Sequence, residues 1–157
     1  MNYNRSRFGV VIVGDELLSG KRRDGHLNFI SDTLSRLGGQ LEWVRIVADD
    51  IPLQAQTYRE TRANGATVFS FGGIGATPDD LTRQAAARAF ERPLIEHPQG
   101  IKLLKNRFKQ DLSPRRRQLV HFPQGASLIP NPVNQVPGFS LLNHYFVPGF
   151  PSMAWPM

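Results

Sequence analysis

The sequence of 157 residues contains no cysteine. This absence excludes disulfide bonds, thiolate zinc sites, iron–sulfur clusters and a cysteine nucleophile. Long apolar stretches are missing as well, since residues 9–14 fall far short of the roughly 20 residues that span a bilayer. No apolar signal segment follows the polar start, MNYNRSR. We therefore expect a cytoplasmic protein that is neither secreted nor inserted in a membrane.

The composition, with 40% hydrophobic and 20% charged residues, is typical of one globular domain, which we expect over residues 1–157. The formal net charge is +6, but residues 91–157 carry 8 basic and 3 acidic side chains and so hold most of the excess. Their basic residues gather in a belt: Lys102, Lys105, Arg107, Lys109, Arg115, Arg116 and Arg117. A solvated helix face is the favoured interpretation. Nucleic-acid binding is the less favoured alternative. A surface on which bases stack has several aromatic residues between the basic ones, and here Phe108 is the only one.

The first 90 residues alternate between strand-like and helix-like segments. Strands are predicted at residues 7–13, 41–47 and 67–71, where β-branched and aromatic side chains cluster. Helices are predicted for the stripe Leu27, Ile30, Leu34 and Leu37, for residues 52–64 and for residues 81–90. This order predicts an α/β fold, a three-layer α/β/α domain with a mostly parallel sheet.

The last 45 residues differ in composition from the rest, because residues 113–157 contain 8 of the 12 prolines. Proline favours short strands and rigid turns there, with a hairpin over residues 140–147 bent at Asn143–His144. We expect this part to continue the same sheet and to form one wall of a site. The final MAWPM would more naturally open a helix, so related proteins are expected to continue beyond it.

The strongest local signal is the glycine-rich segment GGIGATPDD, residues 72–80, between a predicted strand and a predicted helix. Glycines let backbone amides approach an anion, so this segment is typical of a phosphate cradle. It is neither a Walker loop nor a dinucleotide fingerprint. The alternative is a tight turn in which Thr77 caps the helix, Pro78 starts it, and Asp79 and Asp80 complement its dipole.

Carboxylates follow the first two predicted strands. Asp15 and Glu16 come after the first strand, and Asp49 and Asp50 come after the second. Because the carboxyl ends of parallel strands share one edge of a sheet, these acids and the glycine-rich segment are expected to meet there. Such a set would suit Mg²⁺ or another divalent cation beside a phosphorylated ligand, although ordinary polar loops and a helix cap are the alternatives. The four histidines lack metal-ligand spacing and are expected to be structural or exposed.

These motifs together resemble a known family. The segments GDELLSG (14–20), VADD (47–50), GGIGATPDDLTRQAAA (72–87), NPVNQVPGF (131–139) and VPGFPSM (147–153) are similar to the molybdopterin-binding domain. That domain occurs in molybdenum-cofactor biosynthesis proteins and at the amino end of competence/damage-inducible protein A. The resemblance covers nearly the whole chain in the right order. The competence branch fits better, because it shares the opening and the PGF and PGFP segments.

The resemblance implies specific residue roles in a site for molybdopterin or a nucleotide. Gly72, Gly73, Gly75 and Thr77 would form the phosphate loop; Asp49 and Asp80 would be catalytic, and Asp79 and Asp80 would hold a divalent metal. Asp15 and Glu16 would lie at the pocket's edge, and Asn131, Pro137, Gly138, Pro148 and Gly149 would line the opposite rim. Ala76 stands where many relatives have proline. A homo-oligomer, dimer or trimer, is also implied.

The resemblance leaves the activity open. Competence-type members and the related domain of eukaryotic FAD synthases are associated with metal-dependent hydrolysis of ADP-ribose or FAD-like pyrophosphates, whereas the adenylyltransferase branch joins AMP to molybdopterin. Both chemistries handle a phosphoanhydride. A binding-only protein is the third possibility. The nicotinamide-mononucleotide amidase activity of some competence-type proteins belongs to a separate domain and is not expected of these residues.

Overall fold

The apolar run near the start of the chain forms β1 (Arg7–Val13), an inner strand of a six-stranded sheet in the computed structural model, which describes residues 6–157. The strand order is β2-β1-β3-β8-β7-β6. The other strands of this sheet are β2 (Gln40–Val47), β3 (Thr67–Phe71), β6 (Ser127–Ile129), β7 (Gly138–Leu141) and β8 (His144–Val147). Neighbours from β2 to β8 pair in parallel, and β7 and β6 continue antiparallel. The three predicted strands and the predicted extension of the sheet by the C-terminal part are confirmed.

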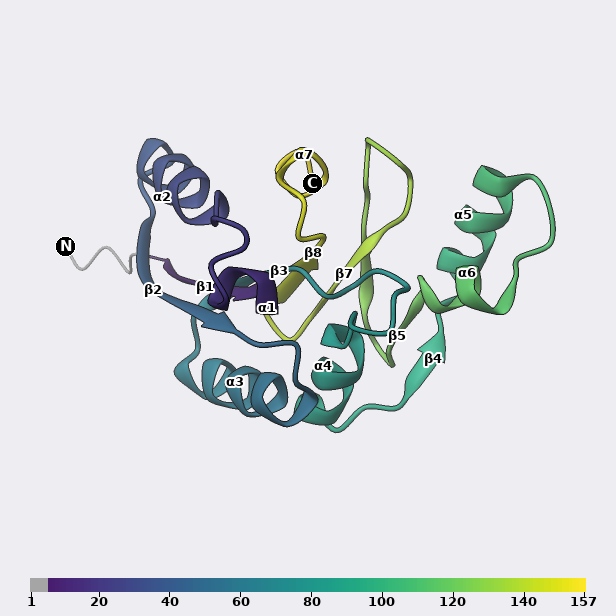
Figure 1. Cartoon of the computed structure of the whole chain (residues 1–157), viewed down its shortest axis with the longest axis horizontal. Helices are drawn as coiled ribbons and strands as arrows, with labels where there is room; N and C mark the ends of the chain where they lie inside the picture. Colours follow the sequence, from purple (N-terminus) through teal and green to yellow (C-terminus); the bar gives the residue numbers. More distant parts are fainter. Residues whose placement is uncertain (1–5) are drawn as a thin grey trace.

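Helices cover both faces of this sheet, as Figure 1 shows. On one face lie α3 (Ile51–Asn64) and α4 (Thr82–Phe90), and on the other lie α2 (His26–Arg36) and α7 (Pro151–Ala154). Successive side chains of a strand point to opposite faces, so alternate residues of β1 join two separate hydrophobic cores, each against one helix layer. The predicted three-layer α/β/α fold is confirmed.

The remaining elements lie at the ends of the sheet. The short α1 (Asp15–Leu18) follows β1 directly. At the far side, α5 (Pro98–Phe108) and α6 (Pro114–Gln118) lie next to each other beside a two-stranded sheet (Figure 1). That sheet consists of β4 (Leu94–Glu96) and β5 (His121–Pro123). In the part of the chain that the structure describes, we find no helix long and apolar enough to cross a bilayer.

The predicted leucine stripe of α2 is only half correct. Ile30 and Leu34 are buried, whereas Leu27 is 41% and Leu37 is 79% exposed. The first core position of this helix belongs instead to His26, whose ring stacks on Phe71 with 4.1 Å between centroids. Leu37 lies beyond the last helical residue, where the chain turns toward β2.

The hairpin near the C-terminus turns one residue earlier than predicted. Leu142 and Asn143 both adopt positive φ angles, of 49° and 64°, and form the turn between β7 and β8. His144 is therefore the first residue of β8 and is completely buried. Its burial agrees with the structural role expected for it.

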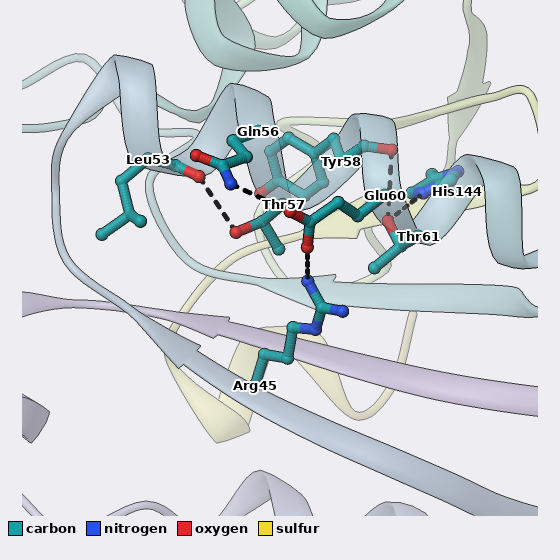
Figure 2. A network of polar contacts seen from close by, with 8 residues as sticks. All are labelled: Arg45, Leu53, Gln56, Thr57, Tyr58, Glu60, Thr61 and His144. Atoms are coloured by element: carbon teal, nitrogen blue, oxygen red, sulfur yellow. Dashed lines mark hydrogen bonds and ion pairs between the residues drawn. The ribbon is translucent and has the colours of Figure 1, made fainter.

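Side-chain hydrogen bonds fasten α3 to the sheet, as Figure 2 shows. At the exposed side of the helix, Glu60 pairs with Arg45 of β2. At the buried side, Nδ1–H of His144 donates to the carbonyl of Leu142 at 2.8 Å, and Nε2 lies 2.8 Å from the hydroxyl oxygen of Thr61, which also lies 3.2 Å from the carbonyl oxygen of Tyr58. A neutral imidazole satisfies both contacts, and burial lowers the pKa of His144 below its ordinary value.

Acidification is expected to destabilise the fold through His144. An unfolded histidine takes up a proton near pH 6.5, whereas the folded protein, with the lowered pKa of His144, takes it up only at a lower pH. The unfolded state binds more protons in that interval, so stability falls as the pH drops through it. Urea unfolding at about pH 7.5 and about pH 5.5 measures the loss. The variant His144→Gln should lose less than the native chain, and an equal loss would contradict this role.

Candidate functional site

A pocket of about 520 Å³ lies beyond the carboxyl ends of β1, β2, β3 and β8. Its lining includes most of the residues expected at a site: Glu16, Asp49, Gly72, Gly73, Gly75, Thr77, Asp79, Asp80, Asn131, Pro137, Pro148 and Gly149. Asp15, Asp50 and Gly138 are the expected residues that do not line it. Asp50 instead caps α3, where its side chain accepts from the amide of Leu53 at 2.8 Å, so for this residue the helix-cap alternative is correct. The convergence of the three strand-end loops with the proline-rich part is thus found, and the C-terminal part forms one wall.

The glycine-rich loop turns its carbonyl groups toward α4 and α6. The Thr82 hydroxyl lies 3.0 Å from the carbonyl oxygen of Gly72, and the Thr82 amide donates to Gly73 at 3.0 Å. Farther along, Nη1 of Arg83 donates to the carbonyl of Ile74 at 2.8 Å, and Nε of Arg115 donates to that of Ala76 at 3.2 Å. Four carbonyls of the loop are therefore held from behind.

The N–H groups of the same peptides consequently point the other way. In a planar trans peptide the N–H is opposed to the C=O, so the amides of Gly73, Ile74 and Gly75 point away from α4. Within residues 6–157, none of these three amides donates a hydrogen bond to another group. All three residues line the pocket. The loop therefore offers it three successive unpaired donors, the arrangement that binds an anion.

The end of the loop is closed by Asp80. Its Oδ2 accepts from both the amide, at 2.8 Å, and the hydroxyl of Thr77. The helix α4 begins only at Thr82, with Leu81 before it. The alternative in which Thr77 caps the helix and Pro78 starts it is therefore wrong, because residues 77–80 form a separate turn ahead of the helix.

The acidic residues at the ends of β1 and β2 bind each other's backbone. The amide of Asp15 donates to Asp49 at 3.0 Å, and the amide of Asp49 donates to Asp15 at 3.0 Å. Burial raises the pKa of the Asp49 carboxyl, and the carboxylates of Asp15, Glu16 and Asp79 act in the same direction. Asp15 thus supports the pocket through Asp49 without lining it.

Gly138 has a packing role. A methyl group at this position would lie 2.4 Å from the carbonyl oxygen of Phe146 on the neighbouring strand. Only glycine lets β7 and β8 approach this closely, so the structure connects Gly138 with the sheet and not with the lining of the pocket.

The prediction of the site missed Arg22, Asn134 and an apolar wall. Arg22 lines the pocket, and its Nη2 lies 2.9 Å from Oε1 of Glu16. The missed apolar residues of the lining are Val13, Ile74, Leu119, Val136, Phe150 and Met153. The only sequence signal for Arg22 is its place in the basic run KRRD just after the loop at Gly20. Such a run is equally typical of a solvent-exposed segment.

The basic belt does not form one continuous surface. Lys102 and Lys105 are exposed on α5, whereas Arg117 makes two hydrogen bonds with Glu96, at 2.6 and 2.7 Å. Arg116 lies over the ring of Phe108, 4.1 Å from its centroid. Since Arg115 contacts the glycine-rich loop, part of the belt serves the fold around the pocket.

No three His, Asp or Glu side chains among the described residues are grouped as a metal ion would require. Asp79 and Asp80 are neighbours at the pocket, but one oxygen of Asp80 is already committed to Thr77. His26 contacts the carbonyl of Gly149 and the indole of Trp155, and His97 contacts the carbonyl of Ala126. The donor set therefore does not fit a metal ion without oxygens from a ligand.

Comparisons with known proteins agree with this architecture. A sequence profile described as a probable molybdopterin binding domain matches residues 9–157. The chain belongs to this molybdopterin-binding domain family. A CinA-like protein of Citrifermentans bemidjiense is 38% identical over 153 residues, which cover 92% of this chain and 37% of the relative. A CinA-like protein of Nostoc punctiforme is 34% identical over 157 residues, which cover 94% and 38%. This molybdopterin-binding domain thus spans less than two fifths of either relative.

Solved structures show the same fold. The crystal structure of CinA from Thermoplasma acidophilum, described as a protein of unknown function, is 27% identical with a TM-score of 0.87, over 98% of this chain and 94% of that one. A tungsten cofactor synthesizing protein, MoaB of Pyrococcus furiosus, is 23% identical with a TM-score of 0.59, over 97% and 87%. The pocket at the strand ends is therefore a feature of a molybdopterin-binding domain with a CinA-type fold.

Proposed function

We propose that this molybdopterin-binding domain binds a pterin or nucleotide through a phosphate group seated on the amides of Gly73, Ile74 and Gly75. The observation that carries the proposal is the set of three unpaired amides that line the pocket while their carbonyls are held from behind. The structure has already oriented these donors, so a phosphate would meet them without reorganising the loop.

The rest of the pocket suits a flat ring joined to that phosphate. Val136, Pro148, Phe150 and Met153 supply an apolar wall, and the pocket's volume of about 520 Å³ lies within the usual range for small-molecule sites. Arg22 supplies a cation that is shared with Glu16. A ligand phosphate would compete with Glu16 for this guanidinium, because both are anionic acceptors.

The same proposal assigns catalysis to Asp49 and Asp80. The raised pKa of Asp49 gives it proton affinity beside the pocket, and Asp80 keeps the phosphate loop closed. Mg²⁺ held by Asp79 and Asp80 stays a prediction. Because the donor set does not fit a metal ion by itself, we assign no step to one.

The proposal is tested with molybdopterin, ADP-ribose, FAD and AMP, each with and without a divalent cation. Calorimetry measures binding, and mass spectrometry reads the phosphates afterwards. Binding with unchanged phosphates indicates a binding domain, and release of AMP indicates a pyrophosphatase. If none of these compounds binds, the proposal fails.

The variant Gly75→Ala is expected to weaken binding of a phosphorylated ligand by roughly tenfold or more, through the loss of one or two charge-assisted hydrogen bonds. A methyl group there would lie 2.5 Å from Oδ2 of Asp80 and would drive that carboxylate off Thr77. The matched control is Gly25→Ala, whose methyl group would meet only ordinary contacts, the nearest at 3.7 Å. Calorimetric affinities compare the two, and equal affinities would contradict the role of the loop.

A further inference from the structure

A second pocket, of about 540 Å³, lies on the other side of the loop that ends at Asp80. Its lining comprises Ala76, Thr77, Pro78, Asp80, Arg83, Gln84, Arg115 and Gln118. Ala76, Thr77 and Asp80 line both pockets, so this stretch of the loop is a wall between them. The proposed function gives no role to the polar residues that α4 and α6 contribute to this second pocket.

Arg83 is the most unusual of these residues, because it is only 3% exposed. Its one hydrogen bond within the described residues goes from Nη1 to the carbonyl of Ile74, and no carboxylate there lies within ion-pairing distance of it. Burial lowers the pKa of Arg83 to about 10, so the side chain stays charged at neutral pH. A buried charge without a partner costs free energy, and an anion would relieve that cost.

The neighbours of Arg83 extend the set of donors. Arg115 is a second guanidinium at the pocket, and its Nε holds the loop at Ala76. Two guanidiniums present several N–H donors in fixed planes, which matches the oxygens of a phosphate. Asp80 is turned toward Thr77, and its carboxylate is the one negative charge in the described lining.

Gln84 indicates which anion fits. Its Oε1 is buried and has no donor within the described residues. A sulfate ion carries no proton near neutral pH and cannot donate to this oxygen. A singly protonated phosphate has an O–H that can donate, while its remaining oxygens accept from the arginines. The pocket therefore suits hydrogen phosphate or a terminal phosphate monoester.

We propose that the second pocket is a phosphate-binding site in which Arg83 and Arg115 bind the oxygens and Oε1 of Gln84 accepts a hydrogen bond from the phosphate O–H. This site is separate from the three amides of the first pocket, so the proposal does not depend on whether those amides bind a phosphate. The phosphate comes either from solution or from the terminal monoester of a ligand that crosses the wall formed by the loop.

Nuclear magnetic resonance can observe both pockets in one titration with inorganic phosphate. The side-chain amides of Gln84 and Gln118 report on the second pocket, and the backbone amides of Gly73 and Gly75 report on the first. A saturable shift at Gln84 is expected, with sulfate binding several-fold more weakly because it lacks the O–H. AMP distinguishes the two sources. If a ligand crosses the wall, AMP shifts the resonances of Gln84 and Gly75 with one common affinity. If the phosphate comes from solution, inorganic phosphate shifts the Gln84 resonance and AMP does not.

The matched pair of variants is Arg115→Gln and Arg116→Gln. They lie side by side on α6 and remove the same charge, but only Arg115 lines the pocket. Arg115→Gln is expected to weaken phosphate binding at Gln84 by roughly fivefold or more, as the loss of a charge-assisted contact does, and Arg116→Gln is expected to leave it unchanged. Equal weakening by both variants would mean unspecific attraction and would overturn the site.

Two further results would also overturn it. One is a titration in which Gln84 and Gln118 do not shift while Gly73 and Gly75 do, which leaves the proposed function standing. The other is a sulfate affinity equal to that of phosphate, which would show that Gln84 accepts no hydrogen bond from the ligand. Shifts at Gln84 without shifts at Gly75 would support the second site while counting against the phosphate loop.

Discussion

Replacing Gly72 with alanine is expected to lower the free energy of unfolding by about 3 kcal/mol or more, through positive φ strain and a steric clash. Gly72 directly follows β3, its amide donates to the carbonyl of Val147 of β8 at 3.0 Å, and its φ is +105°. A methyl group would lie 2.6 Å from the carbonyl oxygen of Val13. That oxygen belongs to the inner strand β1, so it cannot move away cheaply.

The matched control for this prediction is Gly38→Ala. Gly38 also has a positive φ, of +75°, but a methyl group there would meet nothing within 4 Å. Its loss should be about 1 kcal/mol, the cost of the backbone conformation alone. Urea unfolding of both variants separates the clash from the strain. Equal losses would show that β1 yields to the methyl group, and the tight junction of β1, β3 and β8 would then not be what fixes the start of the phosphate loop.

The sheet and its covering helices could be predicted because their signals are local. A β-branched run closed by glycine, such as residues 7–13, and a helix with proline in its first turn, such as residues 52–64, depend on neighbours in sequence. The glycine-rich loop was recognisable for the same reason. Its flanking strand and helix lie within about ten residues of it.

The residues that the sequence did not reveal are those placed by distant parts of the chain. His26 occupies a core position because Phe71 and Trp155 surround it, and neither neighbour can be inferred from the leucine stripe of α2. Arg83 lies in an alanine-rich helix and looks like a solvated arginine. Its burial follows from the way α4 packs behind the loop, which no spacing in the sequence expresses.

The apolar wall of the first pocket shows the same limit. Leu119 comes from the end of α6, Val136 from the segment before β7, and Met153 from α7. Each is an ordinary hydrophobic residue in its own segment, so only the packing of three separate elements makes them a wall. Most of the polar side of the site was predictable from motifs, whereas Arg22 and most of the apolar wall were not.

Replacing Asn131 with aspartate is expected to have the second large effect, a loss of ligand affinity. Asn131 is 5% exposed and lines the first pocket. Its Oδ1 accepts from the amides of Val133 at 3.0 Å and Asn134 at 3.3 Å, which fixes the side chain. Its Nδ2 is buried and has no acceptor within the described residues. An acceptor on the bound ligand would complete this amide, since a buried donor without a partner is costly.

Asn131→Asp keeps the oxygen that holds the turn and replaces the unpaired donor by a second carboxylate oxygen. We expect a lower free energy of unfolding, because the second carboxylate oxygen is buried without a donor. We also expect a loss of affinity for an anionic ligand of roughly tenfold or more at neutral pH, because a donor becomes a like charge. Burial and the neighbouring anionic ligand both raise the pKa of the new carboxyl above the ordinary value of about 3.9. As the pH falls, this group therefore takes up a proton and regains a donor, so the affinity relative to the native chain should recover. Calorimetry of the native chain and the variant at about pH 7.5 and about pH 5.5 measures both effects.

Asn28→Asp is the control for net charge, because it adds the same charge on the exposed side of α2 and does not line the pocket. It should bind the ligand as the native chain does at both pH values. If Asn131→Asp also kept the native affinity, the unpaired Nδ2 would not face the ligand. If it lost affinity without recovery in acid, the turn itself would have failed. A loss that acid reverses identifies Asn131 as a hydrogen-bond donor to the ligand, positioned across the pocket from the phosphate loop.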